Sequence, residues 1–404
     1  MRERLVVVGS GMAAGRMLER LFEVAPDAFD VTLFGAEPRG NYNRILLSPL
    51  LAGQETLEQI VIHNADWYAA RKIACRFGET VTRIDRKAKT VRSWNGETPY
   101  DKLVIATGSA PFQIPVAGKE LQGVLTFRDL DDVNAMVAAA EKPGFKVVVI
   151  GGGLLGLEAA AALRTRGADV TVLHLMGHLM ELQLDPAAGR LLQHTLERRG
   201  ITVHCRAQTT AILGHRRVEA VLLDDGTIYP ADLVVMATGI RPETRIATDA
   251  RLHVERGIVV DDRMLTSDEN ILAIGECVQH DDVCYGFVAP LYDMAEVAAR
   301  TLAGQPAAFR PIQGGVSLKV TGISLYSVGD FHGAEGTESI LLSDPGIGLY
   351  RKLVIRDGRL AGAVLFGDTG DGPWYLDLIR SGAPVEKFRD DLAFGRAAAE
   401  RMAA

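Results

Sequence analysis

The sequence has 404 residues, of which 48% are apolar and 24% charged, and its net charge at pH 7 is −7. This length allows two or three domains with a large core. The acidic balance argues against nucleic-acid binding, which needs a basic face, and no apolar run is long enough to span a membrane. Four cysteines are too few for a disulfide framework, and the start MRERLVVVGSG leaves no room for a signal peptide. We therefore expect a cytoplasmic protein.

A glycine-rich turn follows the first apolar strand and opens a helix. It reads Gly9-x-Gly11-x-x-Ala14, which is the spacing of a turn that binds a dinucleotide pyrophosphate at a helix N-terminus. The next strand is Val31–Phe34, and Glu37 lies just after it, where an acid can accept hydrogen bonds from a ribose diol. This stretch predicts a βαβ nucleotide-binding unit.

A second copy of the pattern lies farther along the chain. The apolar run Val147–Ile150 leads into Gly151-x-Gly153-x-x-Gly156, followed by an Ala-rich helix and another strand. The first glycine permits the tight turn, the second lets the backbone approach a pyrophosphate, and the third lets the helix pack on the strand. Two such units in one chain suggest two nucleotides, most simply a flavin and a nicotinamide.

His174 follows the second strand of this copy, where an acid would select the ribose 2′-hydroxyl of NADH and an arginine would favour NADPH. The segment 174–180 contains no lysine or arginine, which favours NADH and leaves NADPH possible. His174 and His178 have the spacing of a helical metal pair, but no third ligand is nearby in the sequence, so a strand-end loop is the preferred interpretation.

Each half then repeats a small antiparallel meander, a buried strand and the tripeptide Ala-Thr-Gly. In the first half the meander is expected over 72–100, and the tripeptide ends in Thr107 and Gly108. In the second half the tripeptide ends in Gly239. Small residues there let the chain pass close to a nucleotide or cross between domains, and the Pro/Gly-rich segment 109–120 is expected to be a linker.

A further buried strand ends in Gly275 and Glu276, whose carboxylate can accept from the ribityl hydroxyls of FAD. Tyr285–Leu291, which includes Pro290, is expected to precede an Ala-rich helix whose N-terminus faces the flavin ring. Arg44 is the cation of the loop after the first unit, and its natural partner is a reduced flavin or a pyrophosphate, although a solvated loop arginine is the alternative.

The cysteines argue against dithiol chemistry. No cysteine lies between residues 1 and 74, so the first nucleotide has no redox dithiol beside it. Cys277, His280 and Cys284 lie close in sequence, but three soft ligands are a weak metal signal, and we interpret both cysteines as ordinary thiols.

We therefore predict an α/β fold with two Rossmann-like domains and a C-terminal α+β domain. The FAD-binding domain is expected over 1–112 and 241–310, with the NAD(P)H-binding domain inserted over 113–240. The C-terminal domain, 315–404, is expected to be strands followed by short helices, with Asp357–Gly358 as a hairpin turn.

The motifs GSGMAA, KLVIATGSAP, GGGLLGLEAA, VVMATGIRP and TSDENILAIGE resemble those of the two-dinucleotide-fold flavoprotein reductases, which use FAD to pass electrons from a pyridine nucleotide. Four further stretches resemble the FAD-binding part of assimilatory NAD(P)H nitrite reductase large subunits and the electron-transfer subunit of assimilatory nitrate reductase. They are EPRGNYNRILLSPLLAG, HLMGHLMELQLD, IGECVQHDDVCYG and LKVTGISLYSVGD.

The resemblance implies roles for individual residues. It implies that the FAD contacts are Gly9, Gly11 and Ala14 at the pyrophosphate, Glu37 at the adenosine ribose, Arg44 near the flavin, Thr107 and Gly108 at the border, Gly275 and Glu276 at the ribityl chain, and Pro290 near the ring. It implies that the NADH contacts are Gly151, Gly153, Gly156, Glu158 near the nicotinamide, His174 and Gly239. Many relatives carry Asp where this chain has Glu276, and Glu is the form in the nitrite-reductase-like branch.

The implied activity is hydride transfer from NADH to FAD and release of electrons to a metalloprotein, with no catalytic side chain required. The implied acceptor is a nitrate or nitrite reductase catalytic subunit, a ferredoxin or a rubredoxin. Because no cysteine follows Cys284, we expect no iron–sulfur or sirohaem region and no nitrite reduction by the chain alone.

Two alternatives are an NADH oxidase and a flavin-based redox sensor that changes its association state. Peroxide-reducing relatives need a cysteine in the loop 38–50, which has none. The C-terminal domain is expected to form a homodimer interface or to dock the acceptor.

Overall fold

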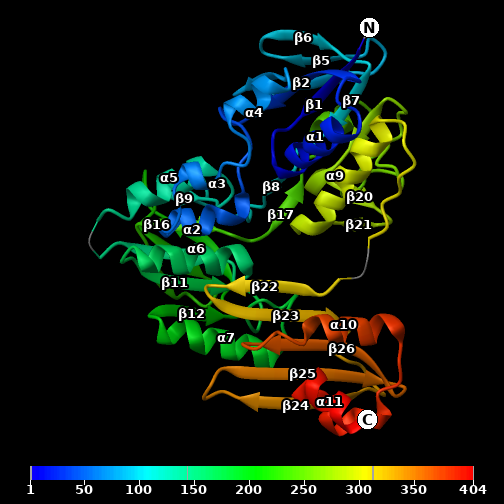
Figure 1. The fold of residues 1–404 in the computed structure, drawn as a ribbon. Coiled ribbons are helices and arrows are strands. Elements are labelled where there is room, and N and C mark those ends of the chain that lie inside the picture. Colours follow the sequence, from blue (N-terminus) through cyan, green and yellow to red (C-terminus); the bar gives the residue numbers. More distant parts are fainter. Residues whose placement is uncertain (1, 143, 312–313, 404) are drawn as a thin grey trace. The chain divides into compact units, whose positions relative to one another are not determined.

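The computed structural model describes residues 2–142, 144–311 and 314–403, drawn in Figure 1. The chain divides into two compact units. Unit 1 comprises Met1–Phe112 and Ile240–Pro311, and unit 2 comprises Gln113–Gly239 and Ile312–Ala404. In the described residues no helix is both long enough and apolar enough to cross a membrane.

Unit 1 is built on a five-stranded parallel sheet with β1 at its centre. In spatial order its strands are β3 (Ala74–Phe77), β2 (Phe29–Gly35), β1 (Glu3–Val8), β7 (Lys102–Ile105) and β19 (Ile271–Ala273). Leu5–Val8 of β1 are buried, as expected for a central strand covered on both faces. Because β19 comes from the second segment of unit 1, the sheet joins two parts of the chain that are far apart in sequence.

Helix α1 (Met12–Val24) follows β1 directly and packs against α9 (Val288–Leu302), as Figure 1 shows. Its buried residues Ala14, Met17, Leu18 and Leu21 recur at the spacing of one helix face. An ion pair of 2.9 Å between Arg20 Nε and Glu296 Oε1 also joins the two helices. The shorter helices of unit 1 are η1 (Arg44–Leu46), α2 (Leu47–Leu51), α3 (Leu57–Ile60), α4 (Ala65–Ala70), α8 (Arg245–Asp249) and η2 (Gly275–Cys277).

The meander expected over 72–100 is smaller than predicted. Its antiparallel part consists of β4 (Arg83–Asp85), β5 (Thr90–Ser93) and β6 (Gly96–Pro99), whereas β3 pairs in parallel with β2. An edge strand of a parallel sheet has one face less covered than a central strand, so its polar–apolar alternation resembles that of a meander strand.

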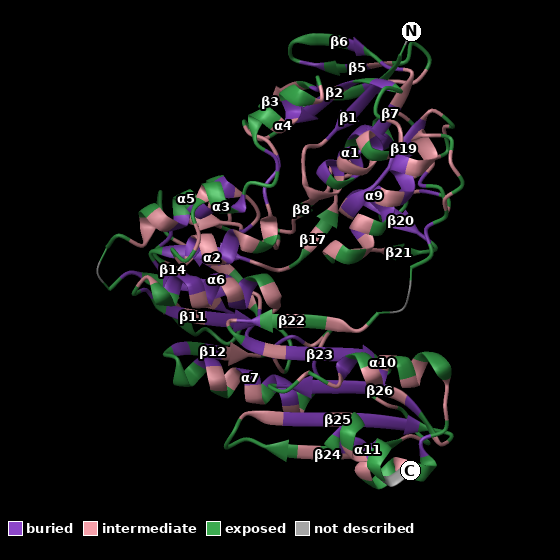
Figure 2. Cartoon of the chain, viewed as in Figure 1, coloured by how far each residue is buried: buried purple, intermediate pink, exposed green. Residues whose placement is uncertain are grey.

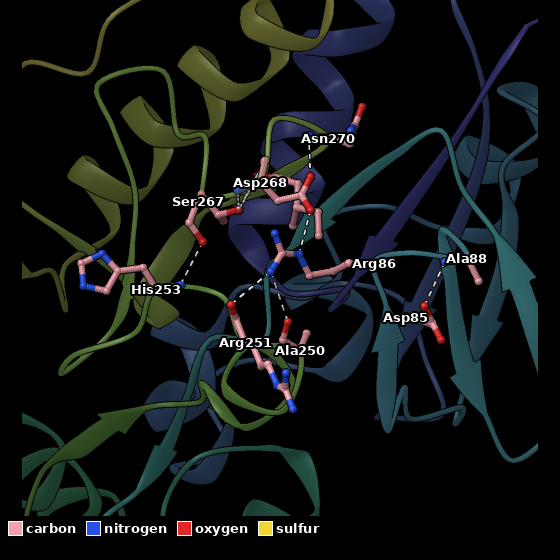
Figure 3. Close-up of polar contacts among 11 residues, drawn as sticks. Asp85, Arg86, Ala88, Ala250, Arg251, His253, Ser267, Asp268 and Asn270 are labelled. Atoms are coloured by element: carbon pink, nitrogen blue, oxygen red, sulfur yellow. Dashed lines mark hydrogen bonds and ion pairs between the residues drawn. The ribbon is translucent and has the colours of Figure 1, made fainter.

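Arg86, in the turn after β4, connects the meander to the second segment of unit 1 (Figure 3). Its Nε donates to Asp268 Oδ2 at 2.8 Å, and its Nη1 donates to the backbone oxygen of Arg251 at 3.1 Å and of Ala250 at 3.5 Å. In the same turn Asp85 Oδ1 accepts from the backbone N–H of Ala88 at 2.9 Å. Arg86 therefore fastens residues 250–268 to a turn far away in sequence.

Two small sheets complete unit 1. One is the antiparallel pair β8 (Ser109–Pro111) and β17 (Ile240–Pro242), so the segment expected to be a linker begins as a strand. The other consists of β18 (Ile258–Val259), β20 (Val278–His280) and β21 (Val283–Cys284).

The first part of unit 2 repeats the architecture of unit 1. Its parallel strands, in spatial order, are β12 (Ile201–Cys205), β11 (Asp169–His174), β10 (Lys146–Ile150), β16 (Leu233–Met236) and β9 (Val124–Leu125). The helices are α5 (Leu130–Ala139), α6 (Leu154–Thr165) and α7 (Pro186–Arg198), and an antiparallel sheet is formed by β13 (Thr209–Leu213), β14 (Ala220–Leu223) and β15 (Ile228–Pro230). In both sheets the strand before the glycine turn is central, which confirms the predicted repeat.

The C-terminal part of unit 2 is a five-stranded antiparallel sheet with helices. Its strands, in spatial order, are β22 (Val316–Val320), β23 (Ile323–Gly329), β26 (Arg359–Phe366), β25 (Leu349–Arg356) and β24 (Glu338–Asp344). The helices that follow are α10 (Gly372–Ser381), η3 (Glu386–Phe394) and α11 (Arg396–Ala403). Asp357 and Gly358 join β25 to β26 with φ of +50° and +69°, so the predicted hairpin is confirmed.

Each of the three parts has its own buried apolar cluster, seen as purple strands in Figure 2. The expected α/β fold with a sheet-rich C-terminal part is therefore confirmed. The predicted boundary between the second segment of the FAD-binding domain, 241–310, and the C-terminal domain, 315–404, includes residues 312–313, which lie outside the described residues.

Candidate dinucleotide sites

The residues predicted to bind FAD follow the carboxyl ends of four neighbouring parallel strands of unit 1. Gly9 follows β1, Glu37 follows β2, Thr107 follows β7 and Gly275 follows β19. The carboxyl ends of parallel strands lie at one edge of a sheet, which is where α/β proteins bind nucleotides. Gly9 has φ of +109°, and a Cβ there would lie 2.1 Å from the backbone oxygen of Ala106, so the loops after β1 and β7 touch.

The N-termini of α1 and α6 are suited to an anion. Gly11 and Gly153 occupy the N-cap positions of these helices. Among the described residues no side chain caps either helix, and neither helix has an acid in its first turn. By contrast, α5 and α7 are capped by the carboxylates of Asp129 and Asp185. Free N–H groups and the positive end of the helix dipole favour phosphate, so both helices fit a dinucleotide pyrophosphate.

The glycines of the second turn have different surroundings. A Cβ on Gly151, whose φ is +122°, would lie 2.2 Å from the backbone oxygen of Ala237, and a Cβ on Gly156 would lie 2.1 Å from that of Gly151. A Cβ on Gly153 would have no neighbour within 4 Å among the described residues. Gly151 and Gly156 are therefore needed for packing, whereas Gly153 leaves a space that a ligand can approach. The first turn has the same open middle glycine at Gly11.

Glu37 is held by two side chains of the following loop. The hydroxyl of Tyr42 donates to Glu37 Oε2 at 2.7 Å, and the guanidinium of Arg44 forms an ion pair with Glu37 Oε1. The guanidinium carbon also lies 5.1 Å from the centre of the Tyr42 ring. The structure thus places Arg44 beside the acid predicted for the adenosine ribose. Tyr42 was not anticipated.

Glu276 lies in η2, and its Oε2 accepts a hydrogen bond from Ser109 Oγ at 2.8 Å. Ser109 was not identified from the sequence because it lies far from Glu276 in the chain. Helix α9 packs against η2 and begins at Val288, so Pro290 lies in its first turn rather than before the helix. Proline is tolerated there because the first N–H groups of a helix have no intrahelical partner.

The Ala-Thr-Gly strand end is tied to the returning chain. Thr107 Oγ1 donates to the backbone oxygen of Glu243 at 2.7 Å, and the N–H of Glu243 donates to the oxygen of Gly108 at 2.9 Å. The small residues of this tripeptide can let the chain pass close to a nucleotide or cross between domains, and these bonds favour the crossing. Gly239 is exposed and lies after β16, and Glu158 is half-buried in α6.

His174 is not an open ribose neighbour. Its ring is buried, Nδ1 accepts from the N–H of Gly152 at 3.0 Å, and Nε2 lies 3.0 Å from Glu181 Oε2. His178 Nε2 instead donates to the backbone oxygen of Leu184 at 3.1 Å. The two histidines therefore have separate partners, which argues against the metal pair. Glu181 is a candidate residue of the nucleotide site that the sequence did not reveal.

The four cysteines are free thiols. Cys277 is fully buried, its Sγ donates to the backbone oxygen of Ile274 at 3.2 Å, and burial raises the pKa of the thiol. His280 Nε2 contacts Asp262 Oδ1 at 2.9 Å, and Asp262 also pairs with Arg310. Cys277 and Cys284 are thus free thiols, and His280 lies beside the carboxylates of Asp262 and Asp281.

The family model for the pyridine nucleotide-disulphide oxidoreductases matches residues 3–301. The chain belongs to this family. Residues 316–383 match the rubredoxin NAD+ reductase C-terminal domain. The family comprises oxidoreductases that use FAD and NAD(P)H, so the predicted class of enzyme and its cofactors are confirmed.

Among the relatives, the chain is 45% identical to the nitrite reductase [NAD(P)H] of Bacillus subtilis over 96% of its own length and 48% of that protein. It is 41% identical to the assimilatory nitrate reductase electron transfer subunit of the same organism, over 94% of its own length and 49% of that protein. The chain thus spans about half the length of these relatives. Among solved structures, the covalent putidaredoxin reductase–putidaredoxin complex matches with a TM-score of 0.87, 26% identity, and coverage of 99% of this chain and 98% of that one.

Proposed function

We propose that this chain is a reductase that takes electrons from NADH through FAD and passes them to a metalloprotein, the catalytic subunit of an assimilatory nitrate or nitrite reductase. The observation that carries the proposal is the duplication: each parallel sheet has an open middle glycine and an uncapped helix N-terminus at its carboxyl edge. The similarity to the two Bacillus subtilis proteins supports the choice of acceptor. Four free cysteines accord with a reducing, cytoplasmic location.

We assign a role in this reaction to individual residues of the two glycine turns and to two glutamates. Gly11 and the N-terminus of α1 would hold the FAD pyrophosphate, and Gly153 and the N-terminus of α6 would hold that of NADH. Glu37, fixed by Tyr42, would accept from the adenosine ribose of FAD. Glu276, fixed by Ser109, would accept from the ribityl chain. The flavin supplies the redox chemistry, because it can accept a hydride and release single electrons.

A rubredoxin or ferredoxin is the second candidate acceptor. The match of residues 316–383 to the C-terminal domain of rubredoxin reductase favours it. In either case we propose that this part of the chain docks the acceptor or forms a homodimer interface.

Anaerobic stopped-flow reduction of the purified protein tests the proposal. The flavin absorbance should bleach rapidly with NADH, and the reduced protein should then be reoxidised rapidly by one of three oxidised acceptors: the nitrate reductase catalytic subunit, a ferredoxin or a rubredoxin. The acceptor-free buffer is the control for spontaneous reoxidation.

Three results would contradict the proposal. A purified protein without flavin would overturn the cofactor assignment. Rapid reoxidation by air and by none of the metalloproteins would indicate an NADH oxidase. Slow turnover with every acceptor, together with an NADH-dependent change in oligomer size, would indicate a redox sensor.

A further inference from the structure

The second nucleotide site has a histidine where a ribose-binding acid was expected, but the structure supplies an acid by another route. His174 Nδ1 accepts from the N–H of Gly152, so it carries no proton in this arrangement. The proton of a neutral ring is therefore on Nε2, which donates to Glu181 Oε2 at 3.0 Å. The buried ring thus connects the glycine turn to a carboxylate seven residues farther along the chain.

The backbone of the intervening loop fixes Glu181 in place. The N–H of Met180 donates to the backbone oxygen of Gly152 at 3.0 Å, so the loop is bonded to the same residue as the His174 ring. Met180 is buried and has φ of +55°, a left-handed conformation that is uncommon outside glycine. The side chain of Glu181 itself is 27% exposed. A carboxylate bonded to His174 retains further lone pairs and can accept from a ribose hydroxyl as well.

A cation lies beside this loop. The backbone N–H of Arg206 donates to the oxygen of Met176 at 3.0 Å, and its guanidinium Nε lies 3.6 Å from the position a Cβ of Gly177 would occupy. Burial raises the pKa of the neighbouring Cys205 thiol, the carboxylates of Glu197 and Glu181 add to that rise, and Arg206 opposes it. Cys205 ends β12 and pairs with His174 at the end of β11, so Arg206 follows the strand next to the one that carries the histidine.

We propose that Glu181, oriented by His174, is the acid that accepts the adenosine ribose hydroxyls of NADH and repels the 2′-phosphate of NADPH. Arg206 is the cation that binds this phosphate once the charge of Glu181 is removed. The proposal rests on the proposed function, because it requires unit 2 to bind a nicotinamide nucleotide. It names His174 as a positioning residue, since its ring is enclosed and acts through Glu181.

Calorimetric titration of the FAD-loaded protein with NAD+ and NADP+ tests the proposal without relying on turnover. The parent protein should bind NAD+ more tightly than NADP+. Glu181→Gln should reduce this preference by about tenfold or more, as expected for the loss of a hydrogen bond to a charged group and of a like-charge repulsion. Glu141→Gln is the matched control, because it removes the same charge from an exposed position that precedes the amino end of β10.

Three further variants separate the parts of the proposal. Glu181→Asp keeps the charge on a shorter side chain, so it should weaken NAD+ binding and still exclude NADP+. In the double variant Glu181→Gln/Arg206→Gln, the gain in NADP+ affinity seen with Glu181→Gln alone should be lost. His174→Gln should weaken NAD+ binding and raise the KM for NADH, while the rate of flavin reduction at saturating NADH stays at the parental value.

An unchanged NAD+/NADP+ ratio in Glu181→Gln, with parental flavin content and Tm, would overturn this inference and leave the proposed function standing. Failure of the parent protein to bind either nucleotide, although it carries FAD, would instead overturn the proposed function. If Glu181→Gln does not fold, Glu181→Asp decides: it should weaken NAD+ binding and still exclude NADP+, and parental NAD+ binding in this variant would contradict the assignment.

Discussion

Replacing Gly153 by alanine separates ligand binding from packing in the second glycine turn. Gly153 has φ of −83°, which alanine adopts readily, and the new Cβ would meet no atom within 4 Å in the part of the chain that the structure describes. Restricting the unfolded chain stabilises the fold by about 0.4–1 kcal/mol, which offsets the lower preference of alanine for the N-cap position of α6, so stability should stay near the parental value. The methyl group would instead occupy the space through which the pyrophosphate approaches the backbone. Losing one charged hydrogen bond costs about 1.5–3 kcal/mol, so the Kd for NADH should rise by about tenfold or more.

Gly156→Ala is the matched comparison. Its Cβ would lie 2.1 Å from the backbone oxygen of Gly151, so helix and strand must move apart, at a cost of about 1–3 kcal/mol. Urea unfolding and NADH titration of both FAD-loaded variants should show a stable Gly153→Ala protein that binds NADH weakly and a destabilised Gly156→Ala protein. Gly153→Ala with parental NADH affinity, or with a loss of stability equal to that of Gly156→Ala, would refute the reasoning.

Three further outcomes follow from unit 1. Arg86→Ala should lower the free energy of unfolding by about 1–3 kcal/mol, because Asp268 and two backbone oxygens lose their donor; a thermal scan in which Arg86→Ala matches the parent protein would contradict this. Burial lowers the pKa of His63 below its ordinary value of 6.5 although Glu19 opposes the shift, so the unfolded state binds the proton more readily and stability should fall as the pH drops through 6.5. In His63→Gln the unfolding midpoint should depend less on pH between about pH 5 and 7. An unchanged pH dependence would exclude His63 as the cause of the loss of stability. Cys277 is buried, whereas the other three cysteines are partly exposed, so Cys277 should react with thiol reagents more slowly than they do, which peptide mapping by mass spectrometry can measure.

The parts of the fold that depend on local backbone chemistry could be predicted from the sequence. Gly9 and Gly151 need positive φ and closeness to a neighbouring backbone oxygen, requirements that only glycine meets, so the turns could be recognised from spacing alone. The buried runs before them identified the central strands. The duplicated order of elements then followed, because both halves carry the same pattern.

The pairings between distant side chains could not be predicted. Ser109 bonds to Glu276, and Arg44 turns back to Glu37, and neither contact leaves a pattern in the sequence. The position of Glu181 depends on the left-handed backbone of Met180, which sequence spacing does not indicate. Even the start of α9 was misplaced, because proline can both precede a helix and occupy its first turn.

The two-segment construction of unit 1 sets the order in which the chain can fold as it is synthesised. Strand β7 lacks its neighbour β19, and the apolar face of α1 lacks α9, until the ribosome has passed residue 302. The parallel sheet of unit 2 is complete once residue 236 has emerged. At about 5–20 residues per second, the interval between β7 and the end of α9 lasts on the order of ten seconds or more. During that time the N-terminal sheet presents an unpaired edge and an uncovered helix, and both can associate with other chains.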